Sequence, residues 1–259
     1  MPSSKIKKVQ NIIKQLFIKK RSTIIFDKLI SRFYSLGKQT NREINVNDFL
    51  VNLSDFCISK DSKLWEESVS FGKNLLKESE KKLQDIDIPL GGGGAYELLY
   101  FLTRYIRPKI IVETGVAAGF SSKAFLTAIH KNKEGKLYSS DFPYFKEDNS
   151  EKYIGLLVDN IYKKNWDLFT EGDLNFIKTL EKKIENSSID LFHYDSDKSY
   201  RSRKKTYNAI KKYLKKKCII IFDDIQDNLH FIDLSSEFEN EKIKVFKFNG
   251  KYIGMIWNI

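Results

Sequence analysis

The spacing of hydrophobic and polar residues changes along the chain near residue 89. In residues 5–20 the apolar side chains recur at helical spacing opposite lysines, which predicts an amphipathic helix. Similar patterns and start signals predict three more helices, over residues 22–36, 47–59 and 61–82. We expect residues 1–88 to be a helical extension that caps the rest of the chain or builds a homo-oligomer. A helix that contacts a membrane surface or a partner is the alternative for residues 5–20.

Beyond residue 89, short apolar runs alternate with amphipathic segments. The apolar runs predict strands over residues 110–112, 137–140, 166–170, 189–194, 218–222, 243–248 and 252–257. Helices are expected between them, over residues 96–105, 121–131, 151–163, 174–185, 200–216 and 229–239. Alternation of this kind predicts a parallel sheet with helices on both faces, and Asn249-Gly250 predicts a tight antiparallel turn. The expected fold of residues 89–259 is therefore α/β, a Rossmann-like, seven-stranded, mostly parallel sheet with a C-terminal antiparallel hairpin.

The composition excludes several classes of protein. The chain has 259 residues, 41% of them hydrophobic, with only four Pro and thirteen Gly, which argues against disordered and collagen-like chains. No uncharged apolar run reaches the roughly 18 residues of a transmembrane helix, and the N-terminus lacks the pattern of a signal peptide. Cys57 and Cys218 give neither a disulfide framework nor zinc-ligand spacing. We therefore expect a cytoplasmic protein.

The chain is basic, with 45 Lys and Arg against 34 Asp and Glu and a net charge of +11. A basic balance is typical of proteins that bind nucleic acid or anionic membranes. Most of the basic residues here are Lys, and Ile and Asn are also plentiful, a mixture that an AT-rich coding bias would produce. We favour a solvated basic surface, and a polyanionic partner is the alternative.

Acidic residues follow each of the five predicted parallel strands. They are Glu113, Asp141, Asp173, Asp195, Asp223 and Asp224. Ligands of such sheets bind beyond the carboxyl ends of the strands, where these side chains gather. An acidic crevice in a basic protein suits a cationic ligand, a metal ion, or both.

A turn rich in small residues follows the first strand. Gly115 and Gly119 allow close approach of a ligand, but their spacing is not the G-x-G-x-x-G of dinucleotide enzymes, and no phosphate-binding GK[ST] occurs. A plain β-α turn is the alternative. Asp141 ends the next strand and can hold two ribose hydroxyls, which favours a nucleoside ligand.

Four stretches of sequence together resemble a known family. They are ETGVAAGFSS (113–122), Asp141, DLFHYDSDKSY (190–200) and IIIFDD (219–224). They resemble the class I S-adenosylmethionine (SAM) methyltransferases, in particular the small metal-dependent O-methyltransferases of the catechol type and the macrocin type, and the cephalosporin-hydroxylase-like proteins. The resemblance covers about residues 89–259. It implies SAM as cofactor, Mg²⁺ or Mn²⁺ as metal, and a hydroxyl of a small molecule or glycan as acceptor.

The resemblance also implies a role for each matching residue. The cofactor-binding set comprises Glu113, Thr114, Gly115, Gly119, Ser121, Ser122, Asp141, Asp173 and Asp195. Within it, Asp141 would bind the ribose and Asp173 would lie by the adenine. The metal ligands would be Asp195, Asp223 and Asp224, and Lys198 would act with Asp195 as the catalytic pair. Many relatives have His near position 198, and the catechol-type pattern has an amide at position 224, so the identity of the base is open.

Simpler roles are available for the same residues. Asp223 and Asp224 would serve as helix caps, Lys198 as a solvated lysine, and Asp197 could replace Asp195 as a ligand. His193 is expected to be a core histidine, with a role as the base as the alternative. Acceptor specificity is expected in residues 1–88 and 142–165, where Tyr144, Phe145 and the nearby Trp166 are candidate pocket walls or ordinary core.

Three functions fit these observations. The first is metal-assisted O-methylation. The second is methylation of RNA or DNA, but the amino-methylating enzymes carry Asn/Asp-Pro-Pro-aromatic after the fourth strand, where this chain has Asp195-Ser196-Asp197-Lys198. The third is a non-catalytic SAM-fold protein acting through its N-terminal helices, which gives no reason for the acidic strand ends. We therefore expect no nucleic-acid substrate.

Overall fold

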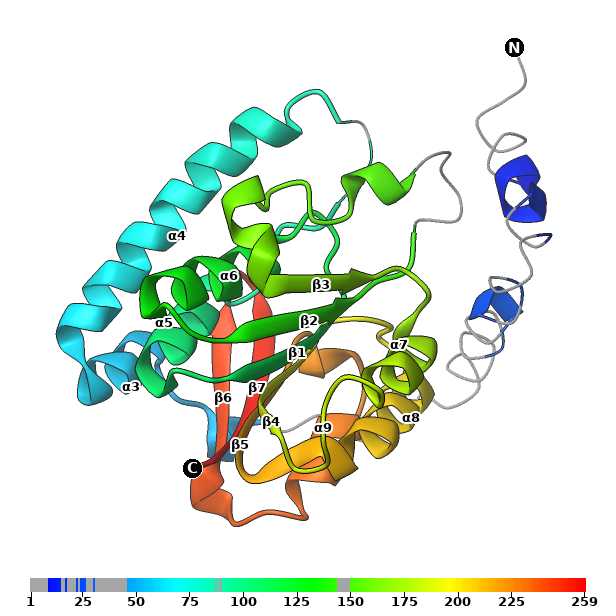
Figure 1. Cartoon of the computed structure of the whole chain (residues 1–259). Helices are drawn as coiled ribbons and strands as arrows, with labels where there is room; N and C mark the ends of the chain where they lie inside the picture. The colour runs from blue at the N-terminus through cyan, green and yellow to red at the C-terminus, as the bar shows by residue number, and fades with distance from the viewer. Residues whose placement is uncertain are drawn as a thin grey trace.

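The computed structural model describes residues 9–14, 17, 22, 24–26, 30, 46–86, 88, 90–143 and 150–259. Figure 1 shows a twisted sheet with helices on both faces and a separate N-terminal segment at one side. Residues 9–14 and 24–26 are helical, and the rest of the helices expected over 5–20 and 22–36 lies mostly outside the described residues. Tyr144 and Phe145 also lie outside them.

The sheet has seven strands in the order β3-β2-β1-β4-β5-β7-β6. Their bounds are β1 Ile110–Thr114, β2 Lys136–Ser140, β3 Trp166–Phe169, β4 Ile189–Tyr194, β5 Leu214–Phe222, β6 Ile243–Phe248 and β7 Lys251–Asn258. The first five strands run parallel, and β7 runs antiparallel between β5 and β6. Asn249 and Gly250 both have positive φ, 47° and 81°, as the tight hairpin turn requires. The predicted fold class is therefore confirmed.

Each strand divides its side chains between two cores. Ile111, Leu191 and Ile219 join the core that α5 and α6 cover, whereas their neighbours Val112, Phe192 and Ile220 join the core against α7, α8 and α9. The alternation follows from the two-residue period of a strand buried on both faces. The longer helices are α3 Leu53–Lys60, α4 Ser62–Leu83, α5 Tyr96–Ile106, α6 Phe120–Asn132, α7 Asp173–Leu180, α8 Tyr200–Ile210 and α9 His230–Ser235.

The prediction of a single helix over residues 151–163 is wrong. Short 3₁₀ turns replace it, η2 at Ser150–Tyr153 and η3 at Asn160–Asn165. Gly155, at φ 71°, interrupts them, and its N–H donates to the carbonyl of Ala117 at 2.8 Å. Because the N–H of Leu157 also donates to Ala118, the segment bonds to the small-residue turn after β1 instead of closing its own helix.

The expected helix over 200–216 ends earlier than its sequence indicates. Helix α8 stops at Ile210, and after the turn η4 Lys211–Tyr213 strand β5 already begins at Leu214, which pairs with Ile189. Residues 214–216 are therefore strand, and Lys216 and Lys217 are exposed there. Helices α7 and α9 also stop short of 185 and 239, and the segment 47–59 divides into η1 Asn47–Phe49 and α3.

Candidate functional site

The ends of β1 and β4 meet closely because residue 115 is glycine. Gly115 has φ 87°, a conformation that disfavours other residues. A Cβ atom there would lie 2.9 Å from the backbone nitrogen of Ser196 and closer still to the carbonyl of Asp195. Gly119, at φ 98°, allows a similar approach of Gly155. The two glycines that the sequence singled out therefore draw the strand ends and the 155–157 segment together.

Glu113 lies at the centre of a buried hydrogen-bond cluster. Its carboxylate accepts from the hydroxyls of Ser121 at 2.5 Å, Ser122 at 2.6 Å and Ser139 at 2.7 Å. Glu113 thus fixes the start of α6 to β1 through Ser121 and Ser122, and β2 to β1 through Ser139. The sequence did not single out Ser139. His193 is buried, with Nδ1 at 3.9 Å from Glu113, as a core histidine would be.

Asp141 holds the turn that follows β1. Its Oδ2 accepts from the N–H groups of Val116 at 3.1 Å and Ala117 at 2.6 Å, and its Oδ1 from Phe142 at 2.5 Å. A carboxylate offers about four acceptor positions, so further donors can share it. Thr114 ends β1, and its buried hydroxyl has no hydrogen-bond partner among the described residues.

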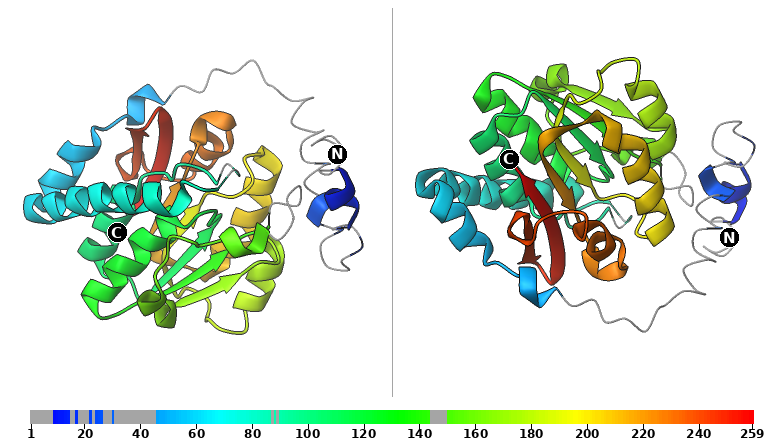
Figure 2. Two further views of the ribbon diagram at one scale, coloured as in Figure 1. Left: turned by 90° about the horizontal axis from the view of Figure 1, so that it is seen from above. Right: turned by 90° about the horizontal axis from the view of Figure 1, so that it is seen from below.

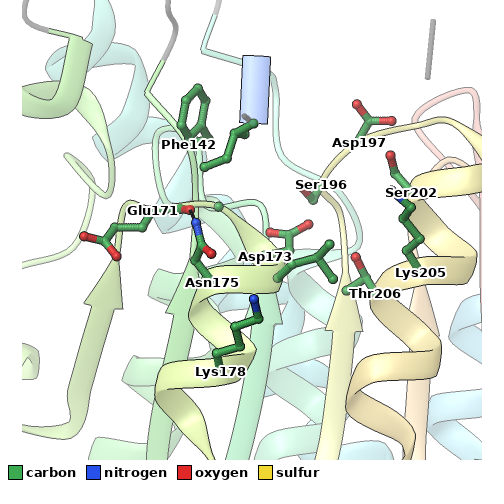
Figure 3. A pocket seen from close by; sticks show the side chains of 13 residues that line it. Phe142, Glu171, Asp173, Asn175, Lys178, Ser196, Asp197, Ser202, Lys205 and Thr206 are labelled. Atoms are coloured by element: carbon green, nitrogen blue, oxygen red, sulfur yellow. Dashed lines mark hydrogen bonds between the residues drawn. The ribbon is translucent and has the colours of Figure 1, made fainter. Parts of the chain in front are cut away.

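A cavity of about 200 Å³ opens beyond the ends of β3 and β4 (Figure 3). Asp173 lies on its wall, and its Oδ1 accepts from the Ser140 hydroxyl at 2.7 Å. The cavity is lined by Ile24, Phe142, Glu171, Gly172, Asp173, Leu174, Asn175, Lys178, Ser196, Asp197, Ser202, Lys205 and Thr206. Of these, sequence analysis singled out only Asp173 and Asp197 as site candidates. Trp166 is not on this wall, because its indole packs beneath Gly155 and donates to Ser139 at 2.9 Å.

Three carboxylates converge beside this cavity, at the ends of β4 and β5. Ligand oxygens of Asp195, Asp223 and Asp224 lie within 4.8 Å of one another. Lys198 forms an ion pair with Asp195, and its Nζ lies 2.8 Å from Asp224. Lys251 adds a second ammonium, 3.1 Å from Asp224. The sequence missed Lys251 because it follows the hairpin turn, far along the chain from any motif.

The pKa values of neighbouring residues in the cluster shift in opposite directions. Burial raises the pKa of Asp223 to about 6, with Asp195 and Asp224 adding to the rise. Burial would also raise the pKa of Asp224, but Lys198 and Lys251 hold it below its ordinary value. Burial opposes the charge on Lys198, yet Asp195 and Asp224 keep its pKa above the ordinary value. Lys198 is therefore protonated in this arrangement.

The Asp223 carboxylate is the unusual member. It is 1% exposed, and neither oxygen has a hydrogen-bond partner among the described residues. The Nζ of Lys251 lies 3.8 Å from its Oδ2, beyond hydrogen-bond distance. A buried carboxylate without hydrogen bonds is costly, and a bound cation is one of the few groups that satisfy it. The donor set of three carboxylates is the hard oxygen set that Mg²⁺ and Mn²⁺ favour. The residues present therefore fit a divalent cation.

Two neighbours fix Asp223 in place. The fully buried Arg203 donates to the carbonyls of Asp223 at 2.8 Å and Asp224 at 2.9 Å, and so holds the left-handed turn at Asp224, where φ is 51°. On the other side Gly94 packs its Cα against the carboxylate, so that a Cβ atom there would lie 2.9 Å from the Asp223 Cγ. The glycine run after residue 90 thus has a steric role that its sequence alone did not show.

Comparisons with known proteins agree with this geometry. A family model described as a methyltransferase domain matches residues 112–225, and no curated protein sequence matches the chain. The O-methyltransferase TomG from Streptomyces achromogenes, solved with SAM, is 13% identical, with a TM-score of 0.54 over 75% of this chain and 97% of that one. A putative caffeoyl-CoA O-methyltransferase from Staphylococcus aureus is 12% identical, with a TM-score of 0.54 over 74% and 97%. An O-methyltransferase from Bacillus cereus, solved with SAH, is 15% identical, with a TM-score of 0.50 over 79% and 94%.

At such identities the solved structures show a shared fold, and the family model adds the domain type. The matched range begins in β1 and ends just after β5, so it includes the small-residue turn, Asp141, Asp173 and the three-carboxylate cluster. A methyltransferase domain model thus matches residues 112–225, and the strand order is that of a fold similar to the solved O-methyltransferases.

Proposed function

We propose that this methyltransferase methylates a hydroxyl oxygen of a small molecule or glycan, with the help of a divalent cation held by Asp195, Asp223 and Asp224. The observation that carries the proposal is the buried Asp223 carboxylate, which accepts no hydrogen bond from the described residues and faces two further carboxylates. A protein without catalysis would gain stability by replacing such a group, because the ammonium of Lys251, 3.8 Å from its Oδ2, compensates its burial only in part.

SAM would lie along the ends of β1, β2 and β3. Asp141 would accept from the ribose hydroxyls, and Asp173, on the wall of the cavity, would lie by the adenine. Glu113 would act through the serines that it fixes, while the N–H groups at the start of α6, around Ser121 and Ser122, would meet the carboxylate of the cofactor. Thr114, Gly115 and Gly119 would complete this wall. When bound, SAM supplies the methyl group of its sulfonium.

The cluster would orient the acceptor next to the cofactor. When bound, a divalent cation acts as a Lewis acid that favours the alkoxide or phenoxide form of a hydroxyl. Arg203 and Gly94 would hold Asp223 in the required position. Asp195, at the end of β4, would connect the metal side of the site with the cofactor side.

Lys198 is the candidate base. Asp195 and Asp224 keep its pKa high in the present arrangement, so its Nζ holds a proton. A cation on the same carboxylates would remove that support, since a neighbouring positive charge lowers the pKa of a lysine. The Nζ of Lys198 could then take the proton of the acceptor hydroxyl. Lys251 would remain near Asp224 and limit the net negative charge of the site.

The proposal is tested by transfer of a labelled methyl group from SAM to a panel of catechols, sugars and glycans, with Mg²⁺, with Mn²⁺ and with EDTA. We expect EDTA to abolish transfer and to leave the affinity for SAM, measured by calorimetry, nearly unchanged. Full activity in EDTA would refute the metal assignment. RNA is added to the panel as a competing acceptor, and methylation of RNA alone would refute the acceptor class.

A further inference from the structure

The N-terminal segment carries an exposed apolar face. Val9, Ile13 and Phe17 follow one another at intervals of four residues and are 55%, 48% and 84% exposed. Phe26 and Ile30, further along the segment, are also exposed, at 56% and 41%. Figures 1 and 2 show the segment at one side of the molecule, on the side of α7 and α8. Three large apolar side chains at helical spacing, such as Val9, Ile13 and Phe17, mark an interaction surface, whereas single ones elsewhere need no explanation.

Residues further along the segment contact the rest of the protein. Ile25 is fully buried, and Ile24 lines the cavity and lies against Gly172. The segment is therefore anchored at residues 24–25, beside the proposed cofactor cavity, while Val9, Ile13 and Phe17 project from it into solvent.

The charge of the segment indicates what covers this face. Residues 5–21 contain seven Lys or Arg and no acidic residue, and the first acidic residue of the chain is Asp27. A second copy would bring like charges together, which disfavours a homodimer through this face. Apolar side chains flanked by lysines instead match the boundary between anionic headgroups and acyl chains. No helix of the described residues is long and apolar enough to cross a membrane.

We propose that residues 5–21 bind the surface of a membrane that contains anionic lipids, with Val9, Ile13 and Phe17 inserted among the headgroups. The contact holds the cofactor cavity close to the membrane, because Ile24 joins the segment to the cavity wall. The proposal does not depend on the metal or on the acceptor class.

The test is sedimentation of the full-length protein with vesicles of phosphatidylcholine alone or of phosphatidylcholine with phosphatidylglycerol. We expect binding only to the second kind, and its loss at high salt. Phe17→Asp should weaken vesicle binding by roughly 10-fold to 100-fold, because one large apolar side chain is no longer buried among the headgroups. Ile161→Asp is the matched control, since Ile161 is 61% exposed on η3, outside the segment.

A second pair of variants separates the segment from the net charge. Replacing Lys7, Lys8 and Lys14 by Gln should weaken vesicle binding by on the order of 100-fold, because each lysine near an anionic surface adds to the free energy of binding. Replacing Lys211, Lys216 and Lys217, which are exposed elsewhere, changes the net charge equally and should have little effect.

Equal loss in both triple variants would overturn the proposal and leave a general effect of charge. Equal binding of the wild type and Phe17→Asp would overturn it as well. A dimer that forms in solution without vesicle binding, and is lost in Phe17→Asp, would assign the face to a second copy. If Phe17→Asp does not change vesicle binding and nucleic acid displaces the vesicles from the protein, the basic residues bind a polyanion. Circular dichroism of each variant checks that the fold is retained.

Discussion

Gly94→Ala tests whether the glycine run positions the proposed metal ligand. The new Cβ would lie 2.9 Å from Cγ and 3.0 Å from Oδ1 of Asp223, where ordinary contacts begin at 3.4 Å. Oδ2 of Asp223 would be closer still, so the carboxylate must move by about 1 Å, and the bonds from Arg203 to the carbonyls of Asp223 and Asp224 oppose that movement. Displacement of a ligand by a neighbour of this kind costs about 10-fold to 100-fold in metal affinity.

Gly92→Ala is the matched control. A Cβ at Gly92 would have no neighbour within 4 Å, and its backbone is not left-handed, so alanine fits there without strain. The assay is titration of each variant with Mn²⁺, followed by the paramagnetic resonance of the free ion, with SAM binding by calorimetry as a second readout. We expect only Gly94→Ala to weaken Mn²⁺ binding, with SAM binding retained in both variants. Equal Mn²⁺ affinities, or an equal loss of SAM binding in Gly94→Ala, would refute the reasoning.

Four further predictions follow from the same contacts. Asp141→Ala should weaken SAM binding by roughly 1–3 kcal/mol, since ribose hydroxyls lose their acceptor, and an unchanged calorimetric affinity would remove Asp141 from the site. Asp223→Asn should lower methyl-transfer activity as EDTA does, and high Mg²⁺ should restore part of that activity. Activity of this variant that does not depend on the Mg²⁺ concentration would contradict the role of Asp223 as a ligand. Lys198→Ala should lower the rate at saturating metal by about 10²–10⁴-fold, and a pH-rate profile that keeps its acidic limb unchanged would leave the base elsewhere. Burial lowers the pKa of His230 to about 4, with Arg203 adding to the effect, so the contribution of this histidine to stability should be full above about pH 6.5 and fall by about 3 kcal/mol toward pH 4. Urea unfolding at several pH values measures this, and His230→Gln should remove that dependence.

The strand order and the acidic strand ends could be predicted because both depend on local sequence. Val112 and Ile111 sit on opposite faces simply because a strand has a two-residue period, and the turn after Asp141 or Asp223 comes where an apolar run stops. Parallel strands bring their carboxyl ends to one edge, so the sequence could also predict that Asp195, Asp223 and Asp224 converge.

The errors arose where long-range contacts override local preference. Gly155 and Leu157 bond to the turn after β1, so the helix expected over 151–163 does not form. The lysines of residues 215–217 look helical, yet pairing with β4 extends β5 back to Leu214. Neither contact leaves a periodic signal in the sequence.

Some site residues were hidden for the same reason. Lys251 comes to Asp224 through the hairpin, and Gly94 comes to Asp223 from a loop that precedes the whole sheet. Ser139 faces Glu113 only because β1 and β2 pair in one register, Glu113 opposite Ser139. Such residues carry no motif, and only the tertiary structure shows them.

A crystal structure with Mn²⁺ and SAH, with diffraction data collected near the manganese absorption edge, tests directly whether the three carboxylates hold a divalent cation beside the cofactor. We expect one anomalous peak among the carboxylates of Asp195, Asp223 and Asp224. We expect the nucleoside of SAH beside Asp141 and Asp173. A map with SAH bound, no anomalous peak among these carboxylates and Lys198 still paired with Asp195 and Asp224 would contradict the proposed metal site.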